Sequence, residues 1–174
     1  IETTPSGSRN RTVVTPDSLA TETVLGTDGS SQTTLPDGTI FGGVQGPDPR
    51  FGMLVPIMAS QKRTTPNGIE TNKTMERTVV LSDRDDFLSV VSITDTKIIN
   101  GRTFISAYDG NTRTFTDTSP EGRINTRQID TKGRVISGQT ENFAPSAFTY
   151  NDNGMLTSAV QGTESAARTS SHSY

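Results

Sequence analysis

Apolar and polar positions alternate in short segments along much of this chain. Phe104, Ser106 and Tyr108 stand two residues apart, and so do Phe148 and Tyr150. A period of two places each set on one face of a β-strand, because successive strand side chains point to opposite faces. These segments have strand length and are separated by turn-forming residues. The pattern therefore predicts an all-β protein with little or no helix.

A four-residue turn phrase, with Pro second and Gly fourth, recurs along the chain. Pro presets φ near about −65° and Gly accepts the positive φ that follows, so each copy predicts a reversal between strands. The copies are Thr4-Pro5-Ser6-Gly7, Leu35-Pro36-Asp37-Gly38, Thr65-Pro66-Asn67-Gly68 and Ser119-Pro120-Glu121-Gly122. Pro5 and Pro36 are 31 positions apart, and Pro36 and Pro66 are 30 apart. This spacing indicates a repeated supersecondary unit.

A second repeat occupies the C-terminal half, in which Tyr108-Asp109, Ile129-Asp130 and Tyr150-Asn151-Asp152 echo one another. The last two continue into Gly133 and Gly154. Asp109 and Asp130 are 21 positions apart, and Asp130 and Asp152 are 22 apart. About 21 residues is the length of two strands with two tight turns. The fold that follows is a stack of antiparallel β-hairpins forming one extended twisted sheet.

The chain reads as a single segment, residues 1–174, with two parts of different regularity. Residues 1–60 carry divergent repeats, whereas residues 61–174 carry the hairpin repeat. Residues 41–57 are rich in Gly and Pro and also in apolar side chains, which predicts a crossover packed down on the sheet, with a binding loop as the alternative. The one helix candidate, Pro16–Val24, is short and rich in Thr.

Composition leaves disorder as an alternative to an ordered sheet. Only 29% of the residues are hydrophobic and there is no Trp, which is typical of chains that cannot offset their ordering entropy. Thr, however, suits a half-solvated strand surface. Charges nearly balance, at 16 basic and 19 acidic residues, and the apolar residues come in groups of strand length. We therefore favour an ordered sheet with much exposed face.

The chemistry-bearing residues are few. The single His, His172, lies close to the end of the sequence and there is no Cys, which argues against Ser-His-Asp triads and against Cys/His metal sites. The densest acidic group, Asp83, Asp85 and Asp86, is interpreted as a charged turn, with a calcium site as the alternative. We expect no enzyme activity and no cofactor. Nor do we expect a nucleic-acid partner, since no basic stripe is present, or a membrane span, since no apolar run is long enough.

Several segments that together cover most of the chain carry a family resemblance. They are Tyr108-Asp109, the glycine-led continuations at 133–135 and 154–156, the phrase at 118–123, and the Gly46-Pro47-Asp48-Pro49-Arg50-Phe51-Gly52 segment. These resemble the RHS/YD-repeat family, which includes bacterial RHS toxins, the encapsulating subunits of Tc toxins and animal teneurins. In that family, long β-hairpins coil into a hollow shell. The name-giving Tyr-Asp dipeptide is intact only at Tyr108-Asp109.

The resemblance implies a non-catalytic wall segment of such a shell, in a secreted or cell-surface bacterial protein that encloses or presents a C-terminal toxin domain. The implied partners are flanking repeats of a longer chain, of which we expect this chain to be an excerpt because it begins with Ile. An enclosed toxin domain, a receptor or a glycan are further implied partners. The residues expected to form the repeat motif are Tyr108, Asp109, Asp130, Gly133, Tyr150, Asp152, Gly154, Pro66, Gly68, Pro120 and Gly122.

Two other functions stay open at this point. One is a carbohydrate- or receptor-binding adhesin module at the cell surface, whose loop tips make the contacts. The other is a hydrolase with a carboxylate pair, for which candidate residues exist but no two are paired by the sequence. Those candidates are Asp48, Asp85, Asp117 and Glu141.

Overall fold

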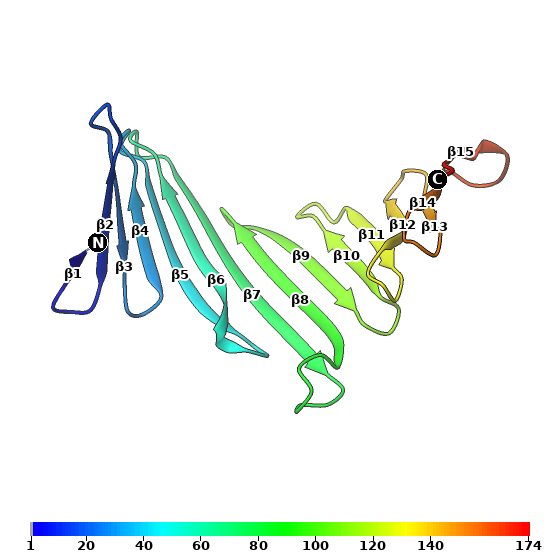
Figure 1. Cartoon of the computed structure of the whole chain (residues 1–174), viewed down its shortest axis with the longest axis horizontal. Coiled ribbons are helices and arrows are strands. Elements are labelled where there is room, and N and C mark those ends of the chain that lie inside the picture. The colour runs from blue at the N-terminus through cyan, green and yellow to red at the C-terminus, as the bar shows by residue number, and fades with distance from the viewer. Residues whose placement is uncertain (1) are drawn as a thin grey trace. The chain divides into compact units, whose positions relative to one another are not determined.

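The computed structural model describes residues 2–174 as one antiparallel β-sheet of 15 strands. The strands follow one another in chain order from β1 to β15, each hydrogen-bonded to its sequence neighbours (Figure 1). This order results when every connection is a hairpin turn, because short turns join only adjacent antiparallel strands. The expected all-β class, an extended sheet of hairpins, is confirmed.

The residues up to Arg77, together with Thr96–Thr103, form one compact unit. Its cross-strand register places Thr23, Thr33, Phe41 and Arg63 opposite one another in a single row, so their side chains share one face. The Arg63 guanidinium lies 5.8 Å from the centroid of the Phe41 ring. The strands of this unit are β1 (Glu2–Thr3), β2 (Arg9–Val14), β3 (Ala20–Leu25), β4 (Ser30–Thr34), β5 (Ile40–Asp48), β6 (Gly52–Thr64) and the first part of β7 (Glu70–Leu81).

Residues Thr78–Asp95 and Phe104–Tyr174 form a second compact unit, so that β7, β8 and β9 each contribute to both units. A row of Tyr108, Phe115 and Arg127 crosses three neighbouring strands here, with ring centroids 4.6 Å apart and the guanidinium 4.5 Å above Phe115. The remaining elements are β8 (Val90–Ile99), β9 (Arg102–Asp109), β10 (Thr114–Thr118), β11 (Ile124–Ile129), β12 (Val135–Thr140), β13 (Ser146–Tyr150), β14 (Leu156–Gln161), the 3₁₀ helix η1 (Glu164–Ala166) and β15 (Arg168–Ser171).

The sheet has no hydrophobic core. Among residues 2–174 no hydrophobic side chain is buried, and the only buried residues are the polar Thr39 and Asp48. The chain exposes 11994 Å², whereas a compact globular protein of 18.6 kDa exposes about 8,200 Å². The strands are therefore held together by their backbone ladders and by cross-strand side-chain pairs, rather than by burial of apolar surface.

Residues 41–57 do not form the expected crossover. They belong to β5 and β6, which make a hairpin with its turn at residues 49–51. The ladder accommodates the Gly and Pro residues through two shifts of register, and Pro47 falls inside the second of them. A register shift tolerates a residue without an N–H group, because the ladder is already interrupted there.

The apolar residues of this hairpin are not packed onto the sheet either. Met53, Leu54 and Val55 are exposed near its tip, and Leu54 has 92% of its surface accessible. The sequence identified the apolar character correctly but not its placement. A single-layer sheet offers no second layer for these side chains to pack against.

The helix candidate Pro16–Val24 is a turn followed by β3. Thr15 and Leu19 close that turn through a backbone hydrogen bond of 3.0 Å, and Ser18 adopts a left-handed φ of 61° inside it. The three-residue η1 is the only helical element in the described range. No helix of residues 2–174 has the length and apolar composition to cross a membrane.

Candidate functional site

One five-residue turn occurs eight times in residues 2–174. In each copy the N–H of the first residue donates to the carbonyl of the fifth at 2.8–3.0 Å, and the fourth residue has a positive φ. This is the hairpin loop in which a type I turn is followed by a left-handed residue. The copies are residues 4–8, 15–19, 26–30, 35–39, 65–69, 119–123, 130–134 and 151–155.

The two repeats of the sequence are therefore one structural motif. The Pro-containing phrases and the Asp130 and Asn151 segments fold into the same turn. Pro66 and Pro120 stand second in their copies, where the fixed φ of Pro fits the turn. Gly68, Gly122, Gly133 and Gly154 all stand fourth, with φ between 78° and 82°. Positive φ at that position explains the preference for Gly.

In five of the eight copies, the first residue of the turn carries a side-chain oxygen that caps the fifth. The N–H of the fifth residue donates to the side-chain oxygen of the first at distances of 2.9–3.3 Å. The accepting residues are Thr15, Thr65, Ser119, Asp130 and Asn151. Hydroxyl, carboxylate and amide oxygens serve equally, because each presents an acceptor at a similar distance from the backbone.

This register corrects the repeat alignment inferred from the sequence. Asn151, and not Asp152, occupies the position of Asp130, since its side chain caps the N–H of Met155 at 2.9 Å. Asp152 stands second in its turn, equivalent to Thr131, and is exposed. The period is therefore 21 positions, from Asp130 to Asn151, where the acidic residues alone indicated 22.

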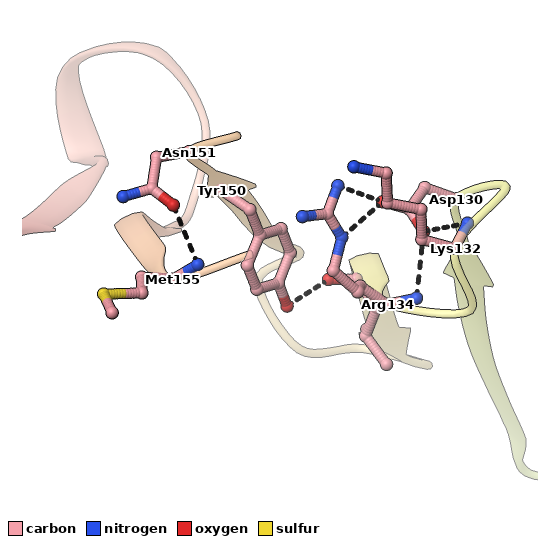
Figure 2. Close-up of polar contacts among 7 residues, drawn as sticks. Asp130, Lys132, Arg134, Tyr150, Asn151 and Met155 are labelled. Carbon is pink, nitrogen blue, oxygen red and sulfur yellow. Dashed lines mark hydrogen bonds and ion pairs between the residues drawn. The ribbon is translucent and has the colours of Figure 1, made fainter. Parts of the chain in front are cut away.

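Asp130 has the fullest set of partners of the five capping residues. Its Oδ1 accepts hydrogen bonds from the N–H groups of Lys132 at 2.8 Å and Arg134 at 2.9 Å, as Figure 2 shows. Its Oδ2 is 2.7 Å from both Nε and Nη2 of Arg134. The hydrogen bond from the Arg134 N–H, together with the guanidinium, holds the pKa of this carboxyl below its usual value of 3.8.

Arg134 connects this turn with the following hairpin. Its guanidinium lies 4.7 Å from the centroid of the Tyr150 ring, and the Tyr150 hydroxyl donates to the carbonyl of Val135 at 2.8 Å (Figure 2). The Nη1 atom of Arg134 lies 3.7 Å from where a β-carbon on Gly154 would stand, an ordinary contact distance, so Gly154 lies beside the guanidinium. Asp130, Gly133, Tyr150 and Gly154 thus belong to one connected group of residues.

Tyr108 and Asp109 lie outside that group, at the connection between β9 and β10. Asp109 ends β9, and its Oδ1 accepts hydrogen bonds from the N–H groups of Asn111 at 2.8 Å and Thr112 at 3.3 Å. This loop has one residue more between its closing partners, Asp109 and Thr114, than the five-residue turn. The dipeptide that best matches the family name is therefore the least typical copy of the motif in this chain.

An ion pair around a buried carboxylate in the first unit was not predicted from the sequence. Asp48 is 2% exposed, and its Oδ2 lies 3.0 Å from Nη1 of Arg77 on β7. Its Oδ1 accepts the N–H of Arg50 at 2.8 Å and lies 3.6 Å from Nε of the same residue. Burial alone would raise the pKa of Asp48, but the Arg50 N–H and the Arg77 guanidinium outweigh it and hold the pKa below 3.8. The sequence signal was the Asp-Pro-Arg segment, but nothing marked Arg77 as its partner.

The other candidate residues stand apart from one another. Asp83 and Asp86 accept hydrogen bonds from the N–H groups of Asp85 and Leu88 in the loop between β7 and β8. Asp117 accepts the Ser106 hydroxyl, and Glu141 accepts the Ile124 N–H. His172 is exposed beyond β15. Within residues 2–174, no three His, Asp or Glu side chains gather as metal ligands would.

No protein-family model matches the chain, and a search of the curated proteins gives no match. The likeness to RHS/YD repeats consequently depends on the residues quoted from the sequence.

Proposed function

We propose that the chain is a non-catalytic structural module, one wall segment of a larger β-sheet shell in a secreted bacterial protein. In this proposal the shell encloses or presents a C-terminal toxin domain, and the surrounding wall is built by further hairpin repeats. The proposal combines the sequence resemblance with the way in which this sheet exposes its surface.

The observation that carries the proposal is the absence of a hydrophobic core within residues 2–174. The accessible surface of 11994 Å² exceeds the value for a compact globule of this mass by almost half. A sheet that buries no hydrophobic side chain gains little of the hydrophobic free energy that normally offsets chain entropy. Such a sheet is understandable as one part of an assembly that covers part of its surface.

The exposed apolar side chains support the same conclusion. Leu54, Leu88 and Phe143 expose between 68% and 92% of their surface, although isolated exposed hydrophobic residues alone require no explanation. The repeated five-residue turn also supports the proposal. A turn that recurs along the chain suits an array in which every repeat packs on its neighbours.

The test compares the isolated 174-residue chain with the same residues in a longer polypeptide that includes more of the natural sequence. Hydrogen exchange should show faster opening in the isolated chain, and the dye ANS should bind to it and not to the longer polypeptide. Replacing Leu54 with Ser should reduce dye binding by the isolated chain. An isolated chain that stays monomeric, binds no ANS and has the same melting temperature as the longer polypeptide would contradict the proposal.

The enclosed domain is tested separately. If the wall surrounds a toxin domain, protease added to the intact natural protein should spare that domain until the wall is denatured. Digestion of the domain at the same rate with and without denaturant would exclude enclosure.

A further inference from the structure

The second unit contains a hollow of about 690 Å³ over β8–β12, which we call the Thr-lined hollow. Eight of its 13 lining residues carry hydroxyl groups, and Asn111 and Gln128 add amide groups. Only Val91 and Ala107 are aliphatic. Sites for drug-like molecules and cofactors of this volume are mostly apolar, so the lining points to a ligand that is itself rich in hydrogen-bonding groups.

The register of the strands arranges these groups in rows. Thr116 lies opposite Ala107 on one side and Thr126 on the other, while Thr114 lies opposite Gln128 in a second row. Neighbouring strands are about 4.8 Å apart and alternate residues of a strand about 6.7 Å apart. The hydroxyl groups therefore form a regular grid, and the small side chain of Ala107 deepens it.

Several of these hydroxyl groups are unused by the protein. Those of Ser92, Thr94, Thr116 and Ser137 have no hydrogen-bond partner within residues 2–174. Gln128 donates its Nε2 to the Thr112 carbonyl at 3.0 Å, which leaves its Oε1 as an acceptor. Each free hydroxyl group can both donate and accept, so the grid can match a ligand that presents alternating donors and acceptors.

Charge narrows the class of ligand. No Lys or Arg lines the hollow, and its single ionisable acid is Asp109. A phosphate, a nucleic acid or a sulfated glycan would find no cation to pair with. An extended peptide is also disfavoured, because β9, β10 and β11 are each paired on both sides and offer no free edge for strand addition.

We propose that the Thr-lined hollow binds a neutral oligosaccharide through hydrogen bonds to the side chains of Thr94, Thr116, Thr126, Gln128 and Ser137. A neutral sugar carries hydroxyl groups around its ring, so it is uncharged and rich in both donors and acceptors. This site goes beyond the proposed wall function and does not depend on it. It requires only that this face of the second unit remain open to solvent.

The experiment is a titration of the full 174-residue chain, with ¹³C-labelled Thr and Ala methyl groups, followed by NMR. The probes are maltohexaose, cellohexaose, laminarihexaose and chitohexaose, with a heparin hexasaccharide and an uncharged Ser/Thr-rich peptide as competitors of other classes. At least one neutral hexasaccharide should shift the methyl signals of Ala107, Thr116 and Thr126 to saturation. The NMR signal of the Thr12 methyl group on β2, in the other unit, should not shift.

Two isosteric variants test the hydroxyl groups themselves. Thr116→Val keeps the side-chain shape and should weaken binding roughly fivefold, the effect of one lost neutral hydrogen bond. Thr126→Val should weaken binding to a similar extent through the loss of an acceptor, since the Thr126 hydroxyl itself donates to the Gln139 carbonyl at 3.4 Å. Thr12→Val is the matched control and should leave the affinity unchanged. If either valine variant disturbs the fold, Ser137→Ala removes a hydroxyl group without adding volume and should weaken binding to a similar extent.

The proposal is overturned if none of the four neutral sugars gives saturable shifts, if the shifts lie elsewhere, or if only heparin or the peptide binds. It is also overturned if affinity is the same in Thr116→Val, Thr126→Val and Ser137→Ala. None of these results bears on the wall function, which is measured by exchange and dye binding without any sugar present.

Discussion

The guanidinium of Arg134 lies 4.7 Å from the ring centroid of Tyr150, one hairpin further along the chain. Arg134 closes the turn before β12, whereas Tyr150 ends β13. The same guanidinium is paired with Asp130 in its own turn. Consecutive hairpin repeats are therefore in physical contact. The guanidinium in the turn of one hairpin packs on an aromatic ring of the next.

This contact predicts a measurable coupling between the two residues. Tyr150→Phe should cost about 1 kcal/mol, since it removes only the hydrogen bond to the Val135 carbonyl. In a double-mutant cycle, Arg134→Ala and Tyr150→Leu should show a coupling energy of about 1 kcal/mol in urea denaturation. The matched pair Arg127→Ala with Tyr150→Leu, which share no contact in the structure, should be additive.

The buried carboxylate of the first unit predicts a larger effect. Asp48→Asn removes the buried carboxylate charge that pairs with Arg77 and Arg50, which should lower the free energy of unfolding by about 3 kcal/mol. The exposed Asp152→Asn, an identical chemical change, should alter it by less than about 0.5 kcal/mol. Equal effects of the two substitutions in chemical denaturation would show that the Asp48 ion pair contributes nothing.

The parts of this fold that sequence could predict are those that short-range chemistry determines. Pro36 and Gly38 dictate the φ values of their turn, so the reversal between β4 and β5 follows from two residues. The Asp48–Arg77 pair lies beyond such reasoning, because it depends on the register of β5 to β7 and on two register shifts. The two register shifts between β5 and β6 also explain why the sequence of residues 41–57, rich in Gly and Pro, predicts a crossover and not a hairpin.

The position of Asn151 was missed for a different reason. Its role depends on a side-chain oxygen that caps the N–H of Met155, and Thr65 and Ser119 perform the same role with hydroxyl groups. An alignment based on acidic residues therefore favoured Asp152. The signal was present as Thr, Ser, Asp or Asn three residues before a glycine, and Thr15 satisfies it too, with Ser18 in place of glycine.

The serine at the fourth position of the 15–19 turn suggests a substitution that should stabilise the protein. Ser18 adopts a φ of 61° at the position that glycine occupies in the other seven turns. Ser18→Gly should therefore raise the stability of the first unit by about 0.5–1 kcal/mol, since it relieves left-handed strain. Gly122→Ala should lower that of the second unit by about 1 kcal/mol, because φ is 80° there and no atom lies within 4 Å to add a clash. Hydrogen exchange of the flanking strands locates each change, and a destabilised Ser18→Gly variant would contradict this view of the turn.

The acidic side chains predict how stability depends on pH. The pKa values of Asp28, Asp37, Asp48 and Asp130 lie below the ordinary 3.8, because each carboxylate accepts hydrogen bonds in the folded chain. Their contribution is complete above pH 3.8 and is lost as the pH falls through the lower folded values, since the unfolded chain then takes up protons first. Urea denaturation across the acidic range should show this decline. Asp48→Asn should flatten it, because one proton-linked group has been removed, whereas Thr12→Val, which alters no carboxyl group, should leave the slope unchanged. A decline of the same steepness in Asp48→Asn would mean that this carboxylate gains nothing from its arginine partners.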